Sequence, residues 1–414
     1  MIKTNALNDF DKGYQYLLLS ILDEGDVRDT RAGKCISTFG KEFKIDLKKG
    51  FPVLTTKKMF TKGVIYELLW FLQHPQDTEN GMNIKYLVDN NVHIWDADAY
   101  RWFKVFIQKE IKDKNRIFDF KVRKRDDDDG FHFEIWERND EFKNNFEKLI
   151  SITKDEFLQF VKDEIVISIY TVYQDGSWKP YQFGDLGKVY GYQWRMWERP
   201  IGDDECVYVD QINKVINTLK TSPTDRRMLC TALNVGQMED MALPPCHVMF
   251  QFYAKKLTRY ERWNEYKNRF GETEEYKTAI NVTELAAKRV ELDEILDVNS
   301  IPIYGLSCKY TMRSCDEFLG QPFNILSYAL LTHMIAKLVN MIPDTLISSM
   351  GDCHIYCAHI DAVKEQLQRK GSPTLPILKI HGEQKTIDDF KYEDFEIIGY
   401  NPDPQIKAPL LVGD

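Results

Sequence analysis

The chain alternates between two kinds of sequence, and this alternation constrains the fold more than any single motif does. Segments rich in aromatic residues, glycine and proline cover about residues 13–102, 183–253 and 304–407. Two charged segments, at about 104–182 and 255–302, separate them. Apolar segments must bury their hydrophobic faces together, whereas charged connections are tolerated at a surface. We therefore predict one domain over residues 1–414 that carries two charged insertions.

The apolar segments contain helix and strand patterns in an irregular order. Residues 64–72 and about 325–339 are apolar on almost every side, which predicts two buried helices. Four shorter runs are typical of strands, at residues 228–233, 248–254, 306–312 and 346–350. Because no regular βαβ period links these elements, we expect an α+β fold with a mixed sheet packed against helices.

The charged segments favour surface structure. The first contains a basic run, residues 121–125, followed directly by Asp126–Asp129. Abutting charge blocks are typical of a solvated loop or a hairpin tip. A metal site built from the four aspartates stays open as an alternative, although consecutive carboxylates converge on one ion only through special turns. The second segment has a helical pattern from Thr283 to Leu296.

Composition argues against several classes of protein. The 414 residues carry a formal net charge of −9, which argues against broad binding of nucleic acid. The apolar runs are shorter than a membrane span, and residues 1–12 lack the pattern of a signal peptide. Eight cysteines are scattered without a pairing rhythm. We therefore expect a cytoplasmic protein with reduced thiols that binds neither nucleic acid nor membranes.

Cys246 is the strongest candidate for chemistry. Pro244 and Pro245 fix the backbone just before it, and a predicted strand follows. A lone cysteine is more often a small buried hydrophobic residue than a nucleophile. However, nearby cations lower the pKa of a thiol and activate it. The pairs Arg226–Arg227 and Arg313–Ser314 supply such cations, and guanidinium groups also suit a phosphate.

Taken together, the motifs resemble those of the thymidylate synthase superfamily, in the family's own order. The resemblance covers about two thirds of the chain, which is everything except the two charged insertions. The matching segments are residues 50–58, 67–72, 187–195, 225–227, 241–253, 313–320, 322–328 and 351–356.

The resemblance implies transfer of a one-carbon unit from 5,10-methylenetetrahydrofolate to C5 of dUMP, without a metal ion. Cys246 would add to C6 of the pyrimidine ring. Asn324 would read N3 and O4, and its donor and acceptor fit uracil better than cytosine. Glu67 would organise water and move protons near O4. Tyr190 would belong to the network that removes the C5 proton.

The phosphate of dUMP would be held by two subunits of a homodimer with shared active sites. Arg313 and Ser314 would bind it within one subunit, and Arg226 and Arg227 would reach it from the other. Arg31 is the expected equivalent of a further phosphate ligand, although it is offset by one residue from the family pattern.

The remaining implied ligands serve the sugar and the folate. His354 and Tyr356 would bond the sugar hydroxyl. Asp316 would bind the pterin, and Trp95 would stack nearby. Lys57 would be available to the glutamate tail of the folate.

Departures from the family pattern cluster where the folate and a closing lid would lie. Leu233 replaces the usual tryptophan, residues 95–102 are remodelled, and a loop is added at 74–82. Gly413 and Asp414 follow the usual small apolar end. A looser site admits water to the methylene intermediate, which gives 5-hydroxymethyl-dUMP and tetrahydrofolate.

We therefore expect a dUMP hydroxymethylase of the kind found in viruses, which would act in the host cell cytoplasm. A thymidylate synthase that forms dTMP and dihydrofolate is the alternative. A non-catalytic nucleotide-binding or RNA-binding relative is a third reading, and the joint presence of Cys246, Glu67 and Asn324 argues against it.

Overall fold

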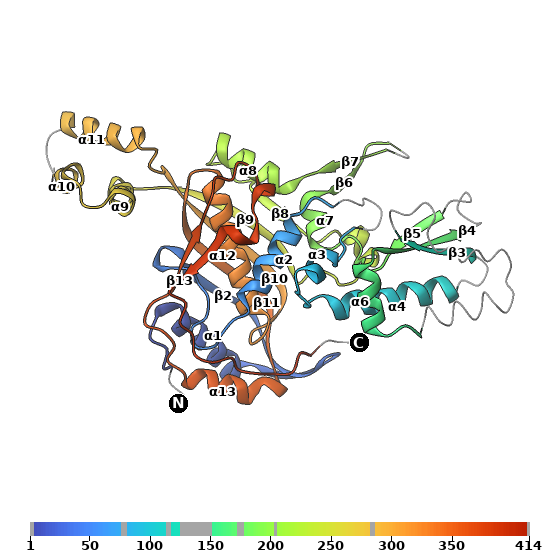
Figure 1. Cartoon of the computed structure of the whole chain (residues 1–414). Helices are drawn as coiled ribbons and strands as arrows, with labels where there is room; N and C mark the ends of the chain where they lie inside the picture. The colour runs from blue at the N-terminus through green and yellow to red at the C-terminus, as the bar shows by residue number, and fades with distance from the viewer. Residues whose placement is uncertain are drawn as a thin grey trace. The chain divides into compact units, whose positions relative to one another are not determined.

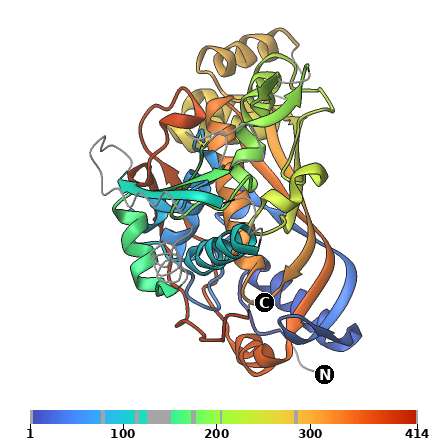
Figure 2. The same cartoon turned by 90° about the vertical axis from the view of Figure 1, so that its right-hand side faces the viewer.

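The computed structural model describes residues 4–75, 81–112, 117–124, 151–171, 178–202, 205–281 and 286–411 (Figure 1). The chain divides into two compact units. Unit 1 comprises Met1–Val64, Ile212–Cys230 and Cys246–Asp414, and unit 2 comprises Ile65–Gln211 and Thr231–Pro245. Figure 2 shows the same ribbon after a quarter turn. The expectation of one catalytic domain with two insertions stays a prediction.

A mixed sheet forms the centre of unit 1. Among the described residues it has six strands in the order β1-β2-β11-β10-β9-β8. Strands β10 and β11 pair in parallel, whereas the pairs β1–β2, β2–β11 and β9–β10 are antiparallel. The strands are β1 (Asp26–Thr30), β2 (Gly33–Asp46), β8 (Leu229–Thr231), β9 (His247–Lys256), β10 (Tyr304–Asp316) and β11 (Ile342–Tyr356). The predicted α+β class and the four predicted strands are confirmed.

Helix α12 connects the two parallel strands. It spans Gln321–Leu338, and most of its side chains are buried, as the apolar run predicts. Pro322 lies in its first turn, where the absence of an N–H has no cost. Parallel strands need such a crossover, and α12 packs against both β10 and β11. The other elements of this unit outside the second insertion are α1 (Asp9–Glu24), η1 (Leu47–Lys49), α8 (Gln211–Thr221), η3 (Cys357–His359), α13 (Ile360–Gln368), β12 (Ile377–Ile380), η4 (Ile387–Asp389), η5 (Tyr392–Asp394) and β13 (Phe395–Ile398).

A buried carboxyl fixes the segment that precedes α2 (Thr61–Leu72). Asp11 of α1 is fully buried and accepts hydrogen bonds from the backbone N–H of Thr55 at 3.1 Å and the hydroxyl of Thr56 at 3.0 Å. Asn8 caps α1 and donates to the carbonyl of Ser372 at 2.8 Å. These bonds hold the backbone immediately before Lys57.

The second charged insertion folds into three helices, which Figure 1 shows, and these helices share a cluster of buried side chains. Helices α9 (Arg259–Phe270), α10 (Glu274–Asn281) and α11 (Ala286–Val298) lie between β9 and β10 in the chain. Thr258 and Glu261 form a capping box that starts α9. The cluster of buried side chains consists of Trp263, Tyr266, Tyr276, Ala279, Leu292, Leu296 and Ile301. The helical pattern predicted from Thr283 is confirmed from Ala286 onward.

Unit 2 contains most of the first charged insertion. Its described residues include a three-stranded antiparallel sheet of β3 (Ile117–Lys124), β4 (Ile165–Thr171) and β5 (Trp178–Gln182). The remaining elements are α3 (Lys85–Asp89), α4 (Asp96–Lys112), α6 (Lys154–Lys162), α7 (Tyr190–Arg195), β6 (Trp197–Pro200), β7 (Cys206–Val209) and η2 (Val235–Asp240). Phe103 lies 5.5 Å from Phe157 and 5.0 Å from Phe183 between ring centroids. Phe157 of the insertion therefore packs against aromatic rings that directly flank the insertion in the chain.

Two expectations fall on residues that the structure does not describe. Asp126–Asp129, and with them the alternative metal site, lie outside the described residues. Residues 121–124 of the basic run belong to strand β3, so their prediction as a loop or tip is wrong, because they pair with β4. Of the added loop at 74–82, only its two ends are described. Within the described ranges, every helix is too short or too polar to cross a membrane.

The core of the second insertion gives a stability prediction. Trp263 is 1% exposed, whereas Tyr260 on the same helix is 64% exposed. Trp263→Ala should lower the free energy of unfolding of α9–α11 by about 3–5 kcal/mol, because it empties a large buried site. Hydrogen exchange and limited proteolysis of residues 259–298 measure this loss. The control Tyr260→Ala should change it by less than about 0.5 kcal/mol. Equal protection in both variants would contradict the assignment of Trp263 to a core.

Candidate functional site

The parallel pairing of β10 and β11 brings the two richest motifs of unit 1 together. Ser314 is the Cα partner of Asp352, and Asp316 is the partner of His354. Side chains of paired residues on neighbouring strands lie on the same face of a sheet. Predicted phosphate, folate and sugar ligands therefore meet where the two strands end.

Cys246 joins this group from the start of β9. The backbone N–H of Arg313 donates to the carbonyl oxygen of Cys246 at 2.8 Å. The Nη2 atom of Arg313 lies 3.6 Å from the Sγ atom of Cys246. A guanidinium at this distance interacts favourably with a negatively charged sulfur. Cys246 is partly exposed, so a reactant has access to the sulfur.

His354 is oriented by a residue that the sequence motifs did not single out. Its Nδ1 atom lies 2.7 Å from the Oδ1 atom of Asp352. The Oδ2 atom of Asp352 accepts a hydrogen bond from Ser37 at 2.9 Å and lies 3.7 Å from the guanidinium of Arg28. The Tyr356 ring meets the His354 ring edge-on at 4.9 Å. An N–H at Nδ1 therefore points at a carboxylate, and Nε2 is the remaining polar atom of the ring.

Asp352 and Arg28 could have been identified only in part from the sequence. Asp352 and His354 are two residues apart in a strand, a spacing that places both side chains on one face. Arg28 gives no such signal, because its contact spans most of the chain.

Asp316 and Lys57 both stabilise the turn after β10. The Oδ1 atom of Asp316 accepts the backbone N–H of Phe318 at 2.9 Å. The Nζ atom of Lys57 donates to the carbonyl of Phe318 at 2.5 Å and lies 3.8 Å from the centre of its ring. Burial lowers the pKa of Lys57 to about 7, and the negative charge of Asp316 opposes this shift. Lys57 is thus engaged within the protein, and its contact with a folate tail stays a prediction.

Asn324 follows the same turn. It lies in the first turn of α12, where its backbone N–H donates to the carbonyl of Gly320 at 3.1 Å. The N–H of Gly320 in turn donates to the carbonyl of Asp316 at 2.9 Å. The two predicted ligands Asp316 and Asn324 are therefore linked by a short hydrogen-bonded connection.

Three predicted phosphate ligands lie on exposed parts of unit 1. Arg31 is exposed in the turn between β1 and β2. Arg226 and Arg227 are exposed before β8, and the guanidinium of Arg227 donates to both oxygens of Asp225, at 3.1 and 2.8 Å. This pairing lowers the pKa of Asp225 to about 2. The roles of these three arginines in binding a phosphate stay predictions.

Glu67, Trp95 and Tyr190 form a separate cluster within unit 2. The indole N–H of Trp95 donates to the Oε1 atom of Glu67 at 2.7 Å. The Tyr190 ring lies 5.9 Å from the Trp95 ring. Burial raises the pKa of Glu67 to about 7, and the bond from Trp95 opposes this shift. A carboxyl with a pKa near neutrality can both accept and release a proton.

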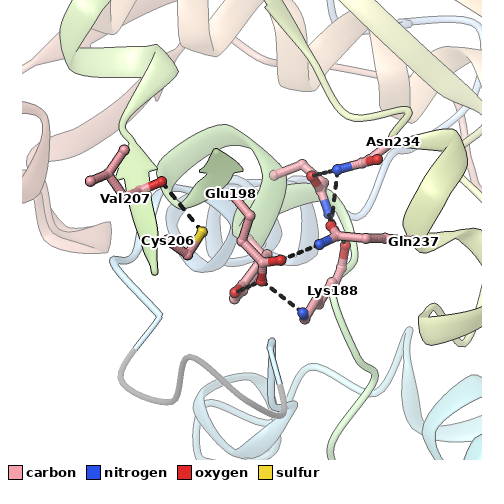
Figure 3. A network of polar contacts seen from close by, with 8 residues as sticks. Lys188, Glu198, Cys206, Val207, Asn234 and Gln237 are labelled. Atoms are coloured by element: carbon pink, nitrogen blue, oxygen red, sulfur yellow. Dashed lines mark hydrogen bonds and ion pairs between the residues drawn. The ribbon is translucent and has the colours of Figure 1, made fainter. Parts of the chain in front are cut away.

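A polar network follows Tyr190 along the chain (Figure 3). Glu198 accepts hydrogen bonds from Lys188 at 2.7 Å, from the hydroxyl of Tyr192 at 2.6 Å and from Gln237 at 2.5 Å. Asn234 donates to Gln237 at 3.0 Å. The network joins α7, which begins at Tyr190, to the segment after Leu233. Sequence patterns did not predict this network, because a charged residue within a short hairpin, such as Glu198 in β6, is ordinarily solvated.

Metal ligation has no support in the described part of the chain. There, histidine, cysteine, aspartate and glutamate side chains nowhere gather in threes with a geometry that could hold an ion.

Comparison with known proteins shows similarity over nearly the whole chain. Residues 12–412 match the family model described as thymidylate synthase. The chain is 36% identical to the thymidylate synthase of Staphylococcus haemolyticus, over 98% of this chain and 100% of that protein. It is 35% identical to that of Listeria monocytogenes, over 96% and 99% of the two chains. It is 34% identical to that of Coxiella burnetii, over 97% and 100%.

The bond between Trp95 and Glu67 gives a titration prediction. Trp95→Phe removes the donor that favours the carboxylate, so the pKa of Glu67 should rise above about 7. Carbon-13 NMR of glutamate-labelled protein measures the shift, with Glu67→Gln to assign the signal. Trp70→Phe is the matched control, because the indole of Trp70 donates to the carbonyl of Asn83 instead. An unchanged or lower pKa of Glu67 in Trp95→Phe would refute the role of this bond.

Proposed function

The chain belongs to the thymidylate synthase family and is a one-carbon transferase, and from this premise we propose that it is itself a thymidylate synthase. It would methylate dUMP at C5, with 5,10-methylenetetrahydrofolate as the donor and dTMP and dihydrofolate as the products. The observation that carries the proposal is the match over residues 12–412, which include every predicted site residue. Relatives that match over nearly their full length are named thymidylate synthase.

These relatives favour the methyl product over the hydroxymethyl product expected from the sequence departures. Leu233 and the remodelled residues 95–102 are compatible with either product, because both lie within the matched region. Trp95 is 7% exposed and bonded to Glu67, which supports an ordered site in this segment. Gly413 and Asp414, the other basis for a water-accessible lid, lie outside the described residues.

The covalent step would begin with Cys246. Its sulfur adds to C6 of the pyrimidine, and the electron pair displaced from the C5–C6 bond moves toward O4. Arg313, 3.6 Å from the sulfur, favours the thiolate that attacks. Asn324 then donates to the oxygen on which negative charge develops. The added charge makes C5 nucleophilic toward the one-carbon unit.

Binding of the nucleotide would place C6 over this sulfur. Arg313 and Ser314 bind the phosphate, and Arg226 and Arg227 complete its site in the other subunit of a homodimer. His354 reaches the sugar hydroxyl through Nε2, because Asp352 holds Nδ1. The orientation of the sugar thus depends on a carboxylate that does not touch the ligand.

Proton transfers would use the Glu67 cluster. With a pKa of about 7, Glu67 relays protons through ordered water without a large energetic cost in either direction. Tyr190 assists removal of the C5 proton. Elimination of the folate then leaves a methylene group on C5, and a hydride from the bound tetrahydrofolate reduces it. The bond between the Cys246 sulfur and C6 breaks in the same stage, so that the C5–C6 double bond is restored and the thiolate is released. Exclusion of water at this stage leads to the methyl product, because water would otherwise add to the methylene group.

Product analysis tests the proposal directly. dUMP with 5,10-methylenetetrahydrofolate should give dTMP and an equal amount of dihydrofolate, followed by mass spectrometry and near-ultraviolet absorbance. Cys246→Ala should abolish turnover and retain dUMP binding, whereas the control Cys206→Ala, at an exposed cysteine of β7, should retain turnover. 5-Hydroxymethyl-dUMP with tetrahydrofolate would show instead that the enzyme is a hydroxymethylase.

Shared active sites give a complementation prediction. Cys246→Ala and Arg226→Ala chains should each be inactive, and mixing them should restore about a quarter of the wild-type sites, because half of random dimers are hybrids with one intact site. Differently tagged chains report subunit exchange independently. Exchange without recovered activity would mean that Arg226 does not act across a dimer.

A further inference from the structure

Glu317 is a buried carboxyl that the proposed reaction does not use. It follows Asp316 directly at the end of β10, and it is 0% exposed. Neither oxygen of its side chain has an N–H or O–H donor among the described residues, and the groups that face it there include the weak thiol donors of Cys315 and Cys353. A buried carboxylate is costly unless a cation or several donors compensate its charge. The surroundings of Glu317 therefore favour the protonated, neutral form of its carboxyl group.

The groups around Glu317 offer little to a negative charge. The titratable groups that face it are Tyr14 from α1, Tyr310, Cys315 and Asp316 from β10, and Cys353 from β11. None of these groups is a cation. The hydroxyl of Tyr14 donates to the backbone carbonyl of Glu317 at 2.5 Å rather than to its carboxyl. The thiol of Cys315 also lies 3.2 Å from Gln321, so it is shared between two acceptors.

Burial is the main reason that the pKa of Glu317 rises, to about 8. The negative charge of Asp316 adds to the rise, and the thiols of Cys315 and Cys353 oppose it. The carboxyl is therefore mostly neutral at pH 7 and becomes charged just above the physiological range.

The position of Glu317 links two predicted ligands. Its backbone N–H donates to the carbonyl of His354 at 2.9 Å, and it is bonded covalently to Asp316. The two thiols that face its side chain belong to Cys315 and Cys353, which are Cα partners across β10 and β11. The side chain therefore packs with Cys315, Cys353 and Tyr14 of α1, while the backbone of Glu317 is joined to both predicted ligands.

We propose that Glu317 is a positioning residue for nucleotide and folate binding: its neutral carboxyl keeps the ends of β10 and β11 packed against α1, and its ionisation releases Asp316 and His354 from their binding positions. A charged carboxylate must be hydrated, and water reaches this position only when that packing opens. The inference rests on the proposed function, because Asp316 and His354 position ligands only in an enzyme that binds dUMP and folate.

The sign of the pH dependence follows from the raised pKa. The folded chain holds the Glu317 proton more tightly than the unfolded chain, whose glutamate has a pKa of 4.5. This group therefore lowers the free energy of unfolding progressively as the pH rises from about 4.5 to about 8. Above that pH the folded chain carries the charge, and well above it ligand affinity should fall about tenfold for each further pH unit.

Calorimetric titration with dUMP between pH 6.5 and 9.5 tests the proposal without turnover. In the wild type the dissociation constant should rise about fivefold between pH 8 and pH 9, because about half of the carboxyl is already ionised at pH 8. In Glu317→Gln, which mimics the neutral carboxyl, and in Glu317→Leu, it should stay within about twofold over this range, since neither side chain ionises. Glu383→Gln, at an exposed carboxyl of the same unit, should follow the wild type. Glu67 titrates lower and is present in every variant, so comparison removes its contribution.

The experiment distinguishes failure of the positioning role from failure of the proposed function. A wild-type affinity that does not change above pH 8, or a change that persists in both Glu317 variants, overturns the positioning role. Thermal unfolding without ligand gives a second readout, in which the fall of Tm with pH should be shallower in both variants. A flattened Tm profile with an unchanged dUMP profile shows a titrating carboxyl that does not position ligands, and so also overturns the proposal. A wild type that binds no dUMP at any pH refutes the proposed function itself.

Discussion

The parallel pairing of β10 with β11 is the constraint on which the rest of unit 1 depends. A shift of this register by one residue would separate Asp316 from His354 and turn their side chains to opposite faces. The pairing itself requires the buried crossover helix α12, whose first turn carries Asn324. It also sets the position of β9, because β10 pairs with β9 on its other side and Arg313 bonds Cys246 there. The hydrogen-bonded pairing of β10 with its two neighbours thus positions the predicted ligands on β10 and β11 and Cys246 before β9.

Burial of ionisable side chains is a second feature that recurs in the molecule, and it shifts their pKa values. Glu67, Lys57 and Glu317 are ionisable groups in positions shielded from water, and burial is the leading cause of each pKa shift. Glu67 and Lys57 titrate at about 7 and Glu317 at about 8, so none is locked in one charge state near neutral pH. Burial destabilises the charged form of each group and so moves its pKa toward neutral pH. Each group can therefore gain or lose a proton near pH 7 to 8.

Sequence patterns predicted the elements that are apolar throughout, and missed those whose partners lie far away in the chain. The runs at 64–72 and 325–339 became α2 and α12 because burial on all sides leaves a plain hydrophobic signal. The sheet β3–β5 was missed because the charge blocks of its segment indicate a surface loop, although β4 itself is apolar. Asp352 and Arg28 were missed because their pairing depends on the fold. Glu317 received no role from the sequence, and the structure shows that its side chain is fully buried.

The second insertion has a consequence for the entropy of the chain. Lys256 and Tyr304, the residues on either side of it, are Cα partners at the end of the β9–β10 ladder. Closing a long flexible loop between two strands costs conformational entropy that grows with loop length. Here α9, α10 and α11 pack on their own buried cluster, whose members are all near one another in sequence. Once these helices have formed, only short connections join them to β9 and β10. The entropic cost of bringing the two strands together is then little larger than for a tight turn.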